Sequence, residues 1–354
     1  MHKFSKDIGD VSWFHENLLG DDAEILDRQL QVENAYSQGP VRSACLLCNS
    51  ILEGLQGFER GQISFVVCEV CGHVNGSHII TEEFVASTYT AKEAVEPESC
   101  LYGEEFTSGK MADEFSEVVE RIYVPKAEFL RDYLVSRGIT ASETSVLDAG
   151  CGSGHFLSAL LKSGFHSSRG FDSFEPAVRA AESIGGFSKS QVSLTAPGDL
   201  LEILRTSDSD VVSMMCVLVH LESPIAAMRA MADNPSIRFS FQKIPMWSFA
   251  TILEAAFPSF RARVLGADHT NVFTFDSLRW LEEELGVSRV ASWSFGGDSL
   301  DLQRKVLIAM GREGASAPLV ERASRELSSV ANGFQQVIDE KGMASEIHLV
   351  WEFH

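Results

Sequence analysis

One segment of the chain combines the end of a strand, a glycine-rich turn and the start of a helix. It reads Val146-Leu147-Asp148-Ala149-Gly150-Cys151-Gly152-Ser153-Gly154-His155-Phe156. An apolar strand ends in an acid, and three glycines at alternate positions then lead into a helix that we predict over 156–163. Glycine allows the backbone to turn tightly and to approach a ligand closely. The segment therefore predicts a ligand site at the carboxyl end of this strand.

Around this segment, short β-rich runs alternate with helical runs. We predict strands at 145–147, 168–171, 191–194, 211–215, 237–242, 289–293, 305–310 and 347–353. Helices are expected between them, and a long amphipathic helix is expected at 318–341. Such alternation is typical of βαβ units, in which helices cover both faces of a parallel sheet.

The glycine spacing differs from the dinucleotide fingerprint Gly-x-Gly-x-x-Gly. It resembles motif I of the class I S-adenosylmethionine-dependent methyltransferases, which typically reads Asp-x-Gly-x-Gly-x-Gly, and the resemblance covers about residues 117–310. It implies an α/β fold with a Rossmann-like, mostly parallel sheet of seven strands. It also implies S-adenosylmethionine as the cofactor.

The ends of the first, second and fourth strands supply the expected cofactor residues. Asp172 stands 24 residues after Asp148, where a carboxylate can accept both hydroxyls of a ribose. In the family, the glycine loop approaches the methionine part of the cofactor. The implied set is Asp148, Gly150, Cys151, Gly152, Gly154, Phe171, Asp172, Ser173, Met215 and Cys216. Asp199 is either an adenine contact or the N-cap of a helix at 200–204.

Four of the seven cysteines form two Cys-x-x-Cys pairs that are separated by nineteen residues. They are Cys45, Cys48, Cys68 and Cys71. Four thiolates at this spacing suit tetrahedral Zn²⁺, and Asn49 and Gly72, which follow the pairs, both tolerate a left-handed backbone. A complete four-cysteine shell leaves no open position, so we predict a structural zinc. His73 is an alternative ligand in place of one cysteine.

The net charge of the chain limits the classes of partner that it can bind. Acidic residues outnumber basic ones by 50 to 29, which gives a formal charge of −21. Such a surface repels nucleic acids and anionic membranes, so we expect neither as a partner. The apolar stretch 211–219 is shorter than the roughly 20 residues of a membrane span, and residues 1–10 lack an apolar signal region. We therefore expect a cytoplasmic protein, while its oligomeric state stays open.

The composition along the chain suggests five parts. They are an N-terminal helical segment (1–40), a zinc-binding module (41–80), an acidic connector with a helix (81–140), an S-adenosylmethionine-binding core (141–312) and a C-terminal helical extension (313–354). Residues 81–120 alone carry a net charge of −9. This part of the connector therefore supplies more than a third of the excess charge, and we interpret it as a solvated segment.

Two histidines are candidates for work on an acceptor. His220 ends a stretch similar to the one after the family's fourth strand, which often reads Glu-His-Leu, with Val219 in place of the Glu. His269 lies in a polar stretch after the fifth strand. A histidine is the side chain that most easily serves as a general base near neutral pH. Either histidine can also be an ordinary loop residue.

A four-cysteine module ahead of such a core is similar to the sugar C-methyltransferases, which act on nucleotide-linked sugars. This resemblance implies that His269 is the base, that Asp268 orients it, and that His220 and Tyr89 line the acceptor pocket. A family tyrosine is replaced by Gly266, and the family's longer C-terminal domain has little counterpart here. Methylation at carbon, oxygen or nitrogen therefore stays open.

We expect an S-adenosylmethionine-dependent methyltransferase that acts on a small polar acceptor, a sugar nucleotide or another saccharide precursor. Two alternatives remain. The first alternative is a non-catalytic, S-adenosylmethionine-binding regulatory protein. The second is a methyltransferase that acts on a protein.

Overall fold

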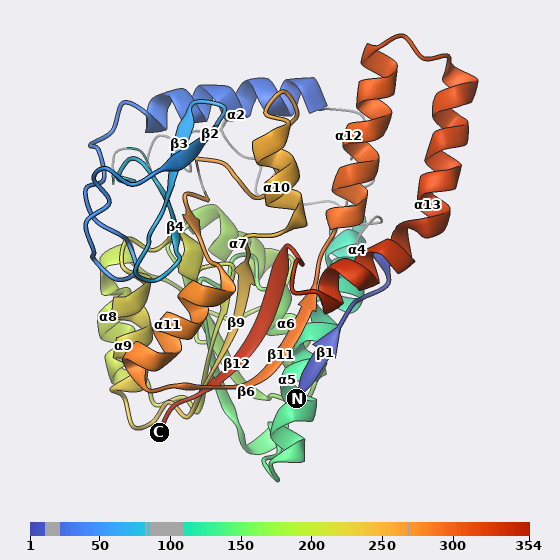
Figure 1. Ribbon diagram of the computed structural model, residues 1–354. Helices are drawn as coiled ribbons and strands as arrows, with labels where there is room; N and C mark the ends of the chain where they lie inside the picture. The colour runs from blue at the N-terminus through green and yellow to red at the C-terminus, as the bar shows by residue number, and fades with distance from the viewer. Residues whose placement is uncertain (11–21, 82–83, 85–108, 268) are drawn as a thin grey trace.

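A computed structural model of the chain describes residues 1–10, 22–81, 84, 109–267 and 269–354. Its largest element is an eight-stranded sheet in the order β1-β11-β12-β9-β8-β5-β6-β7 (Figure 1). The strands are β1 (His2–Phe4), β5 (Ser145–Ala149), β6 (Ser167–Asp172), β7 (Val192–Leu194), β8 (Val211–Met215), β9 (Phe239–Pro245), β11 (Ser288–Phe295) and β12 (Glu346–Glu352). All neighbouring pairs are parallel except those of β12. The predicted α/β fold with a mostly parallel sheet is confirmed.

The predicted number of seven strands is wrong, because β1 adds an eighth at the edge of the sheet. This strand pairs in parallel with β11, and His2 lies opposite Ser292. All three of its residues are exposed. Since neither face of β1 is buried, its sequence shows no alternation of apolar and polar residues that would have indicated a strand.

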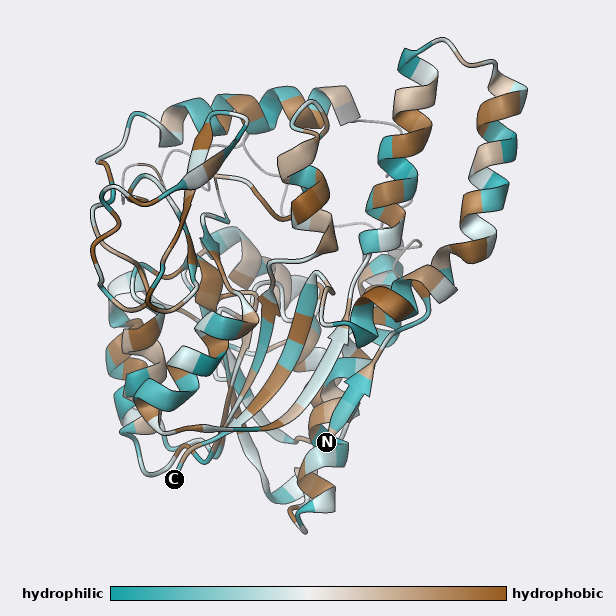
Figure 2. Cartoon of the chain, viewed as in Figure 1, coloured by the Kyte–Doolittle hydropathy of each residue, from teal (hydrophilic) through white to brown (hydrophobic). Residues whose placement is uncertain are grey.

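The strand predicted at 305–310 is also wrong, because these residues belong to α12 (Asp298–Arg312). A short apolar run is compatible with a strand and with a buried helix, and periodicity alone does not separate them. The long helix predicted at 318–341 is present as α13 (Ala317–Glu340). The two helices form a hairpin that extends away from the sheet, with apolar and polar residues in alternating bands (Figures 1 and 2).

Helices cover both faces of the sheet. They are α5 (Val124–Ser136), α6 (His155–Lys162) and α7 (Glu175–Ser183) on one face, and α8 (Leu200–Thr206), α9 (Pro224–Ala232) and α11 (Phe275–Leu285) on the other. Successive strand residues alternate between the faces. Val146 and Val211 pack with the first group, whereas Leu147 and Val212 pack with the second. No helix in the described ranges has the length and apolar character needed to cross a membrane.

The helix before β5 is interrupted at the position where the sequence places a proline. α4 (Gly109–Val118) runs into a π-helical turn at 119–123, and α5 then begins with Pro125 in its first turn. Proline is tolerated there because the first turn has no intrahelical partner for its missing N–H. Residues 85–108 of the predicted acidic connector lie outside the described residues.

The cysteine-bearing part of the chain forms a second, four-stranded antiparallel sheet in the order β10-β4-β3-β2. Its strands are β2 (Gly57–Arg60), β3 (Ile63–Val67), β4 (Val74–Gly76) and β10 (Asn271–Val272). α2 (Asp22–Tyr36) is joined to this sheet by a buried ion pair between Glu33 and Arg60. Since β10 belongs to the C-terminal half of the chain, strand pairing connects the small sheet to the core.

Candidate functional site

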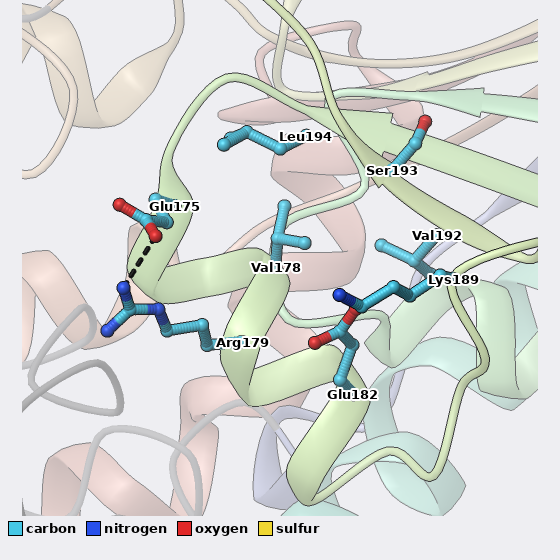
Figure 3. A pocket seen from close by; sticks show the side chains of 8 residues that line it. All are labelled: Glu175, Val178, Arg179, Glu182, Lys189, Val192, Ser193 and Leu194. Carbon is cyan, nitrogen blue, oxygen red and sulfur yellow. Dashed lines mark hydrogen bonds and ion pairs between the residues drawn. The ribbon is translucent and has the colours of Figure 1, made fainter.

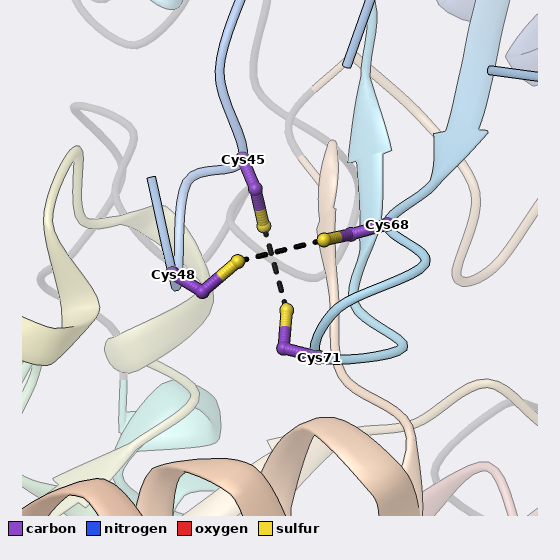
Figure 4. A group of neighbouring side chains, drawn as sticks. All are labelled: Cys45, Cys48, Cys68 and Cys71. Atoms are coloured by element: carbon purple, nitrogen blue, oxygen red, sulfur yellow. Dashed lines mark hydrogen bonds between the residues drawn. The ribbon is translucent and has the colours of Figure 1, made fainter. Parts of the chain in front are cut away.

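The four predicted zinc ligands converge on one point. Their sulfurs all lie within 4.8 Å of one another, with 3.6 Å between the sulfurs of Cys45 and Cys71 and 3.5 Å between those of Cys48 and Cys68 (Figure 4). A tetrahedral ion with Zn–S bonds of about 2.3 Å needs sulfurs about 3.8 Å apart. The four side chains therefore fit zinc, and His73 is not part of this group.

The two Cys-x-x-Cys turns have the backbone that the sequence predicts. Asn49 and Gly72 have positive φ angles of 58° and 71°. Each donates its N–H to the carbonyl of the first cysteine of its pair, at 2.9 Å. The hydroxyl of Ser50 lies 3.0 Å from the sulfurs of both Cys48 and Cys68. These contacts hold the sulfurs in place from outside the cluster.

The glycine loop after β5 forms a cradle that side chains would fill. Gly150, Gly152 and Gly154 all have positive φ. A Cβ on Gly150 would lie 2.5 Å from a methyl carbon of Val217, in the segment after β8. Asp172 closes the loop, because one of its carboxylate oxygens accepts the N–H of Gly152 at 2.8 Å. Glycine is therefore required here by both conformation and space.

Asp148 lies at the base of this cradle and is 1 % exposed. One carboxylate oxygen accepts the hydroxyl of Ser213 at 2.7 Å. The other has no hydrogen-bond partner within the part of the chain that the structure describes. Burial raises the pKa of Asp148 to about 7. An orphaned buried oxygen under an open glycine loop suits a polar ligand that supplies the missing partner.

The other predicted cofactor residues differ in exposure. Cys151 is buried, with its Cβ against the backbone of Gly170, and Phe171 belongs to the apolar core. Ser173 is exposed at the end of β6, and Met215 is half-buried. Asp199 occupies the N-cap position of α8 without a side-chain capping bond.

The two candidate histidines lie beside Cys216. The ring centroids of His220 and His269 are 4.9 Å apart, and the sulfur of Cys216 lies 3.9 Å from Nε2 of His269. Cys216 directly follows β8, and His269 comes just before β10, so two distant segments meet here. Cys216 has a positive φ of 64°, which is uncommon for a residue other than glycine. Asp268 and Tyr89 lie outside the described residues.

Sequence reasoning missed a group of charged residues beside this cluster. Lys243 of β9 forms an ion pair with Glu346 of β12 at 2.9 Å, both of them half-buried, and Lys126 is buried. Burial opposes ionisation of the Cys216 thiol, but Lys243 and both histidines hold its pKa well below the ordinary value. The available signal was a lysine within the mostly buried strand β9.

His155 is a second residue that sequence reasoning passed over, although it ends the glycine loop. Its Nδ1 lies 2.8 Å from the hydroxyl of Ser153, and its ring packs against Phe115 and Tyr123, with centroids 4.3 and 5.5 Å away. Burial lowers its pKa to about 4, so the ring is neutral at physiological pH. Its position as the first residue of α6 was the signal.

A groove of about 410 Å³ lies elsewhere, between α7 and β7 (Figure 3). It is lined by Glu175, Val178, Arg179, Glu182, Lys189, Val192, Ser193 and Leu194. None of the predicted site residues lines it. The chemistry-bearing residues instead gather at the carboxyl ends of β5, β6 and β8, where ligands bind in open α/β sheets.

Solved structures with a similar backbone fold include three methyltransferases. Magnesium protoporphyrin IX methyltransferase from Synechocystis PCC 6803 is 19 % identical, with 55 % of this chain and 84 % of that chain covered and a TM-score of 0.39. A sarcosine dimethylglycine methyltransferase described from Galdieria sulphuraria is 15 % identical, with 71 % and 91 % covered and a TM-score of 0.42. An S-adenosylmethionine-dependent methyltransferase from Archaeoglobus fulgidus is 17 % identical, with 64 % and 94 % covered and a TM-score of 0.39.

None of the curated proteins matches the chain. The family of methyltransferase domains, however, matches it over residues 107–291, which is more than half of its length. This range contains the glycine loop, Asp148, Asp172 and the Cys216–His220–His269 cluster. The chain therefore belongs to the family of methyltransferase domains.

Proposed function

We propose that the protein transfers a methyl group from S-adenosylmethionine to a small polar acceptor, a sugar nucleotide or another saccharide precursor. The observation that carries this proposal is the meeting of two sites at one edge of the sheet. The glycine cradle with its two acids lies beside the cysteine–histidine cluster, because Val217 contacts Gly150 and directly follows Cys216.

The chain has acidic groups for two parts of the cofactor, the ribose and the methionine part. In this proposal Asp172 accepts the ribose hydroxyls, since a carboxylate has further lone pairs beside the two backbone N–H groups that it already binds. We assign the second oxygen of Asp148, which has no hydrogen-bond partner among the described residues, to a polar group of the methionine part. When bound, S-adenosylmethionine supplies an activated methyl group, whose bond to sulfur breaks with its electron pair staying on the sulfur.

His269 acts on the acceptor as general base in this proposal. It takes the proton that the acceptor atom loses as that atom forms its new bond to the methyl carbon. Asp268 orients the ring, and His220 and Tyr89 line the acceptor pocket. The 4.9 Å separation of the two imidazoles supports a shared role at one acceptor, as does the partial exposure of His269.

We also propose that Cys45, Cys48, Cys68 and Cys71 hold a structural zinc that positions the acceptor side. β4 follows the second cysteine pair and pairs with β10, where Asn75 lies opposite Asn271. His269 stands two residues before this pairing. The hydroxyl of Thr274 also donates to the carbonyl of Gly72 at 3.0 Å. The zinc module thus contacts β10 itself through β4 and the residues after β10 through Gly72.

Calorimetry with S-adenosylmethionine, combined with a tritiated-methyl transfer screen over saccharide acceptors, tests the proposal. Asp172→Ala should weaken binding by roughly 10- to 100-fold, because hydrogen bonds to a charged group contribute about 1.5–3 kcal/mol. Asp208→Ala is the matched control, because Asp208 is an exposed acid outside the predicted site. This variant should bind S-adenosylmethionine normally. Absence of binding would overturn the proposal. Binding without transfer to any acceptor would favour a regulatory protein instead.

A further inference from the structure

Three good metal-binding groups face one another at the acceptor side. Sulfur of Cys216 and one ring nitrogen each of His220 and His269 all lie within 4.8 Å of one another. A tetrahedral zinc ion needs a sulfur–nitrogen separation of about 3.6 Å, so the observed 3.9 Å between Cys216 and His269 requires a shift of only a few tenths of an ångström. The cluster is separate from the four-cysteine site.

We infer that Cys216, His220 and His269 bind a divalent metal ion of the zinc type and leave its fourth position open. One thiolate and two imidazoles form a borderline-soft donor set, which suits zinc better than the oxygen-seeking Mg²⁺ or Ca²⁺. Three protein ligands with a free position are typical of catalytic zinc, whereas four cysteines are typical of structural zinc.

The surroundings favour a bound ion over simple packing. His220 is exposed and His269 is half-buried, so the cluster borders solvent. Cys216 takes an unusual positive φ of 64°, which places its sulfur toward the histidines at a backbone cost. Behind the sulfur, the ammonium of Lys243 is paired with Glu346 at 2.9 Å, so its charge is countered within the chain.

This inference rests on the proposed function, which places the acceptor beside the Cys216–His220–His269 cluster. It changes the role that the proposed function gives to His269. With an ion bound, Nε2 of His269 is occupied as a ligand and does not act as the base. A hydroxyl or thiol of the acceptor at the fourth position would instead lose its proton to solvent water, because the metal would lower its pKa. Its oxygen or sulfur would then form the bond to the methyl carbon as the bond from that carbon to the cofactor sulfur breaks. Thiols and hydroxyls are therefore the acceptor groups that this site favours.

The test uses the full chain and Co²⁺ as a spectroscopic probe. After gentle dialysis against a chelator, Co²⁺ should bind and give the visible absorption of a tetrahedral ion with a thiolate ligand. Cys216→Ser should remove the part of the thiolate band that comes from this site and leave the part from the four-cysteine site. His220→Ala should weaken Co²⁺ binding at this site by at least about 10–100-fold, the loss that even outer-shell changes cause. His166→Ala, an exposed histidine elsewhere, is the matched control.

Metal content provides a second readout. By mass spectrometry, the zinc-loaded wild type should hold one ion more per chain than Cys216→Ser, while the four-cysteine site keeps its ion in both proteins. The inference is overturned if the two proteins hold the same amount of metal, or if Co²⁺ binds equally to His220→Ala. If methyl transfer occurs without this second ion, the proposed function stands and His269 remains its base.

Discussion

At the scale of single residues, the glycine loop was predicted best. Its conformation depends on local chemistry, since positive φ angles at Gly150, Gly152 and Gly154 are available to glycine at little cost. The same holds for Asn49 and Gly72 after the cysteine pairs. Lys243 and Glu346 were missed because their pairing depends on strands that are far apart in the chain.

Asp148 leads to a prediction on pH dependence. Its pKa of about 7 lies above the ordinary 3.8, so the folded chain binds more protons than the unfolded chain between about pH 4 and pH 7. The stability that this carboxyl contributes is therefore lost as the pH rises through that window. Asp148→Asn cannot ionise and should gain about 2–3 kcal/mol relative to wild type between about pH 5 and pH 8.

Urea denaturation of both proteins at the two pH values measures this difference. Comparing the variant with wild type removes the contributions of other titrating groups, because these are the same in both chains. A constant offset between the two proteins at both pH values would contradict the prediction.

At the scale of elements, alternation of strands and helices was sufficient to predict most of the main sheet. The exceptions have opposite causes. β1 is too exposed to show a pattern, and 305–310 is apolar enough to resemble a strand although it is helical. β10 has only two residues, and its place beside β4 depends on the packing of the small sheet against the core.

The contact between β4 and the segment before β10 gives a prediction at this scale. A Cβ on Gly76 would lie 2.5 Å from Cβ of Thr270, the residue that follows His269. Gly76→Ala should therefore destabilise the protein by about 1–3 kcal/mol and displace His269, which lowers methyl transfer. Gly198→Ala is the matched control, since nothing lies within 4 Å of its added Cβ.

Thermal unfolding and initial rates of methyl transfer measure the two effects of Gly76→Ala. Hydrogen exchange of the amides at 271–273 reports directly on whether the β10 pairing loosens. If the variant keeps wild-type exchange and wild-type rates, the small sheet does not position His269.

At the scale of the whole molecule, the two terminal strands, β1 and β12, differ in how much they stabilise the fold. β12 lies between β9 and β11, and its residues Leu349, Val350 and Trp351 are buried. A chain that ends at Ser345 would lose these residues, each of which stabilises the fold by about 1.5–3 kcal/mol on burial. It should not fold cooperatively, because typical domains are stable by only about 5–15 kcal/mol.

Deletion of residues 2–4 is the matched comparison. β1 lies at the edge of the sheet and all its residues are exposed, so this chain should keep a cooperative transition with a modestly lower Tm. Circular dichroism with a thermal scan distinguishes the two truncations. Cooperative unfolding of the chain that ends at Ser345 would show that β12 is dispensable.

The sequence by itself determined the features that depend on neighbouring residues. The glycine loop, the two Cys-x-x-Cys turns and the strand–helix alternation arise from backbone preferences and local hydrophobic periodicity. Only the tertiary structure decided which distant groups meet. Cys216 and His220 reach His269, and β4 reaches β10, because parallel strands end at one edge of the sheet and the small module packs there. Such contacts depend on packing over the whole chain, and no local pattern encodes them.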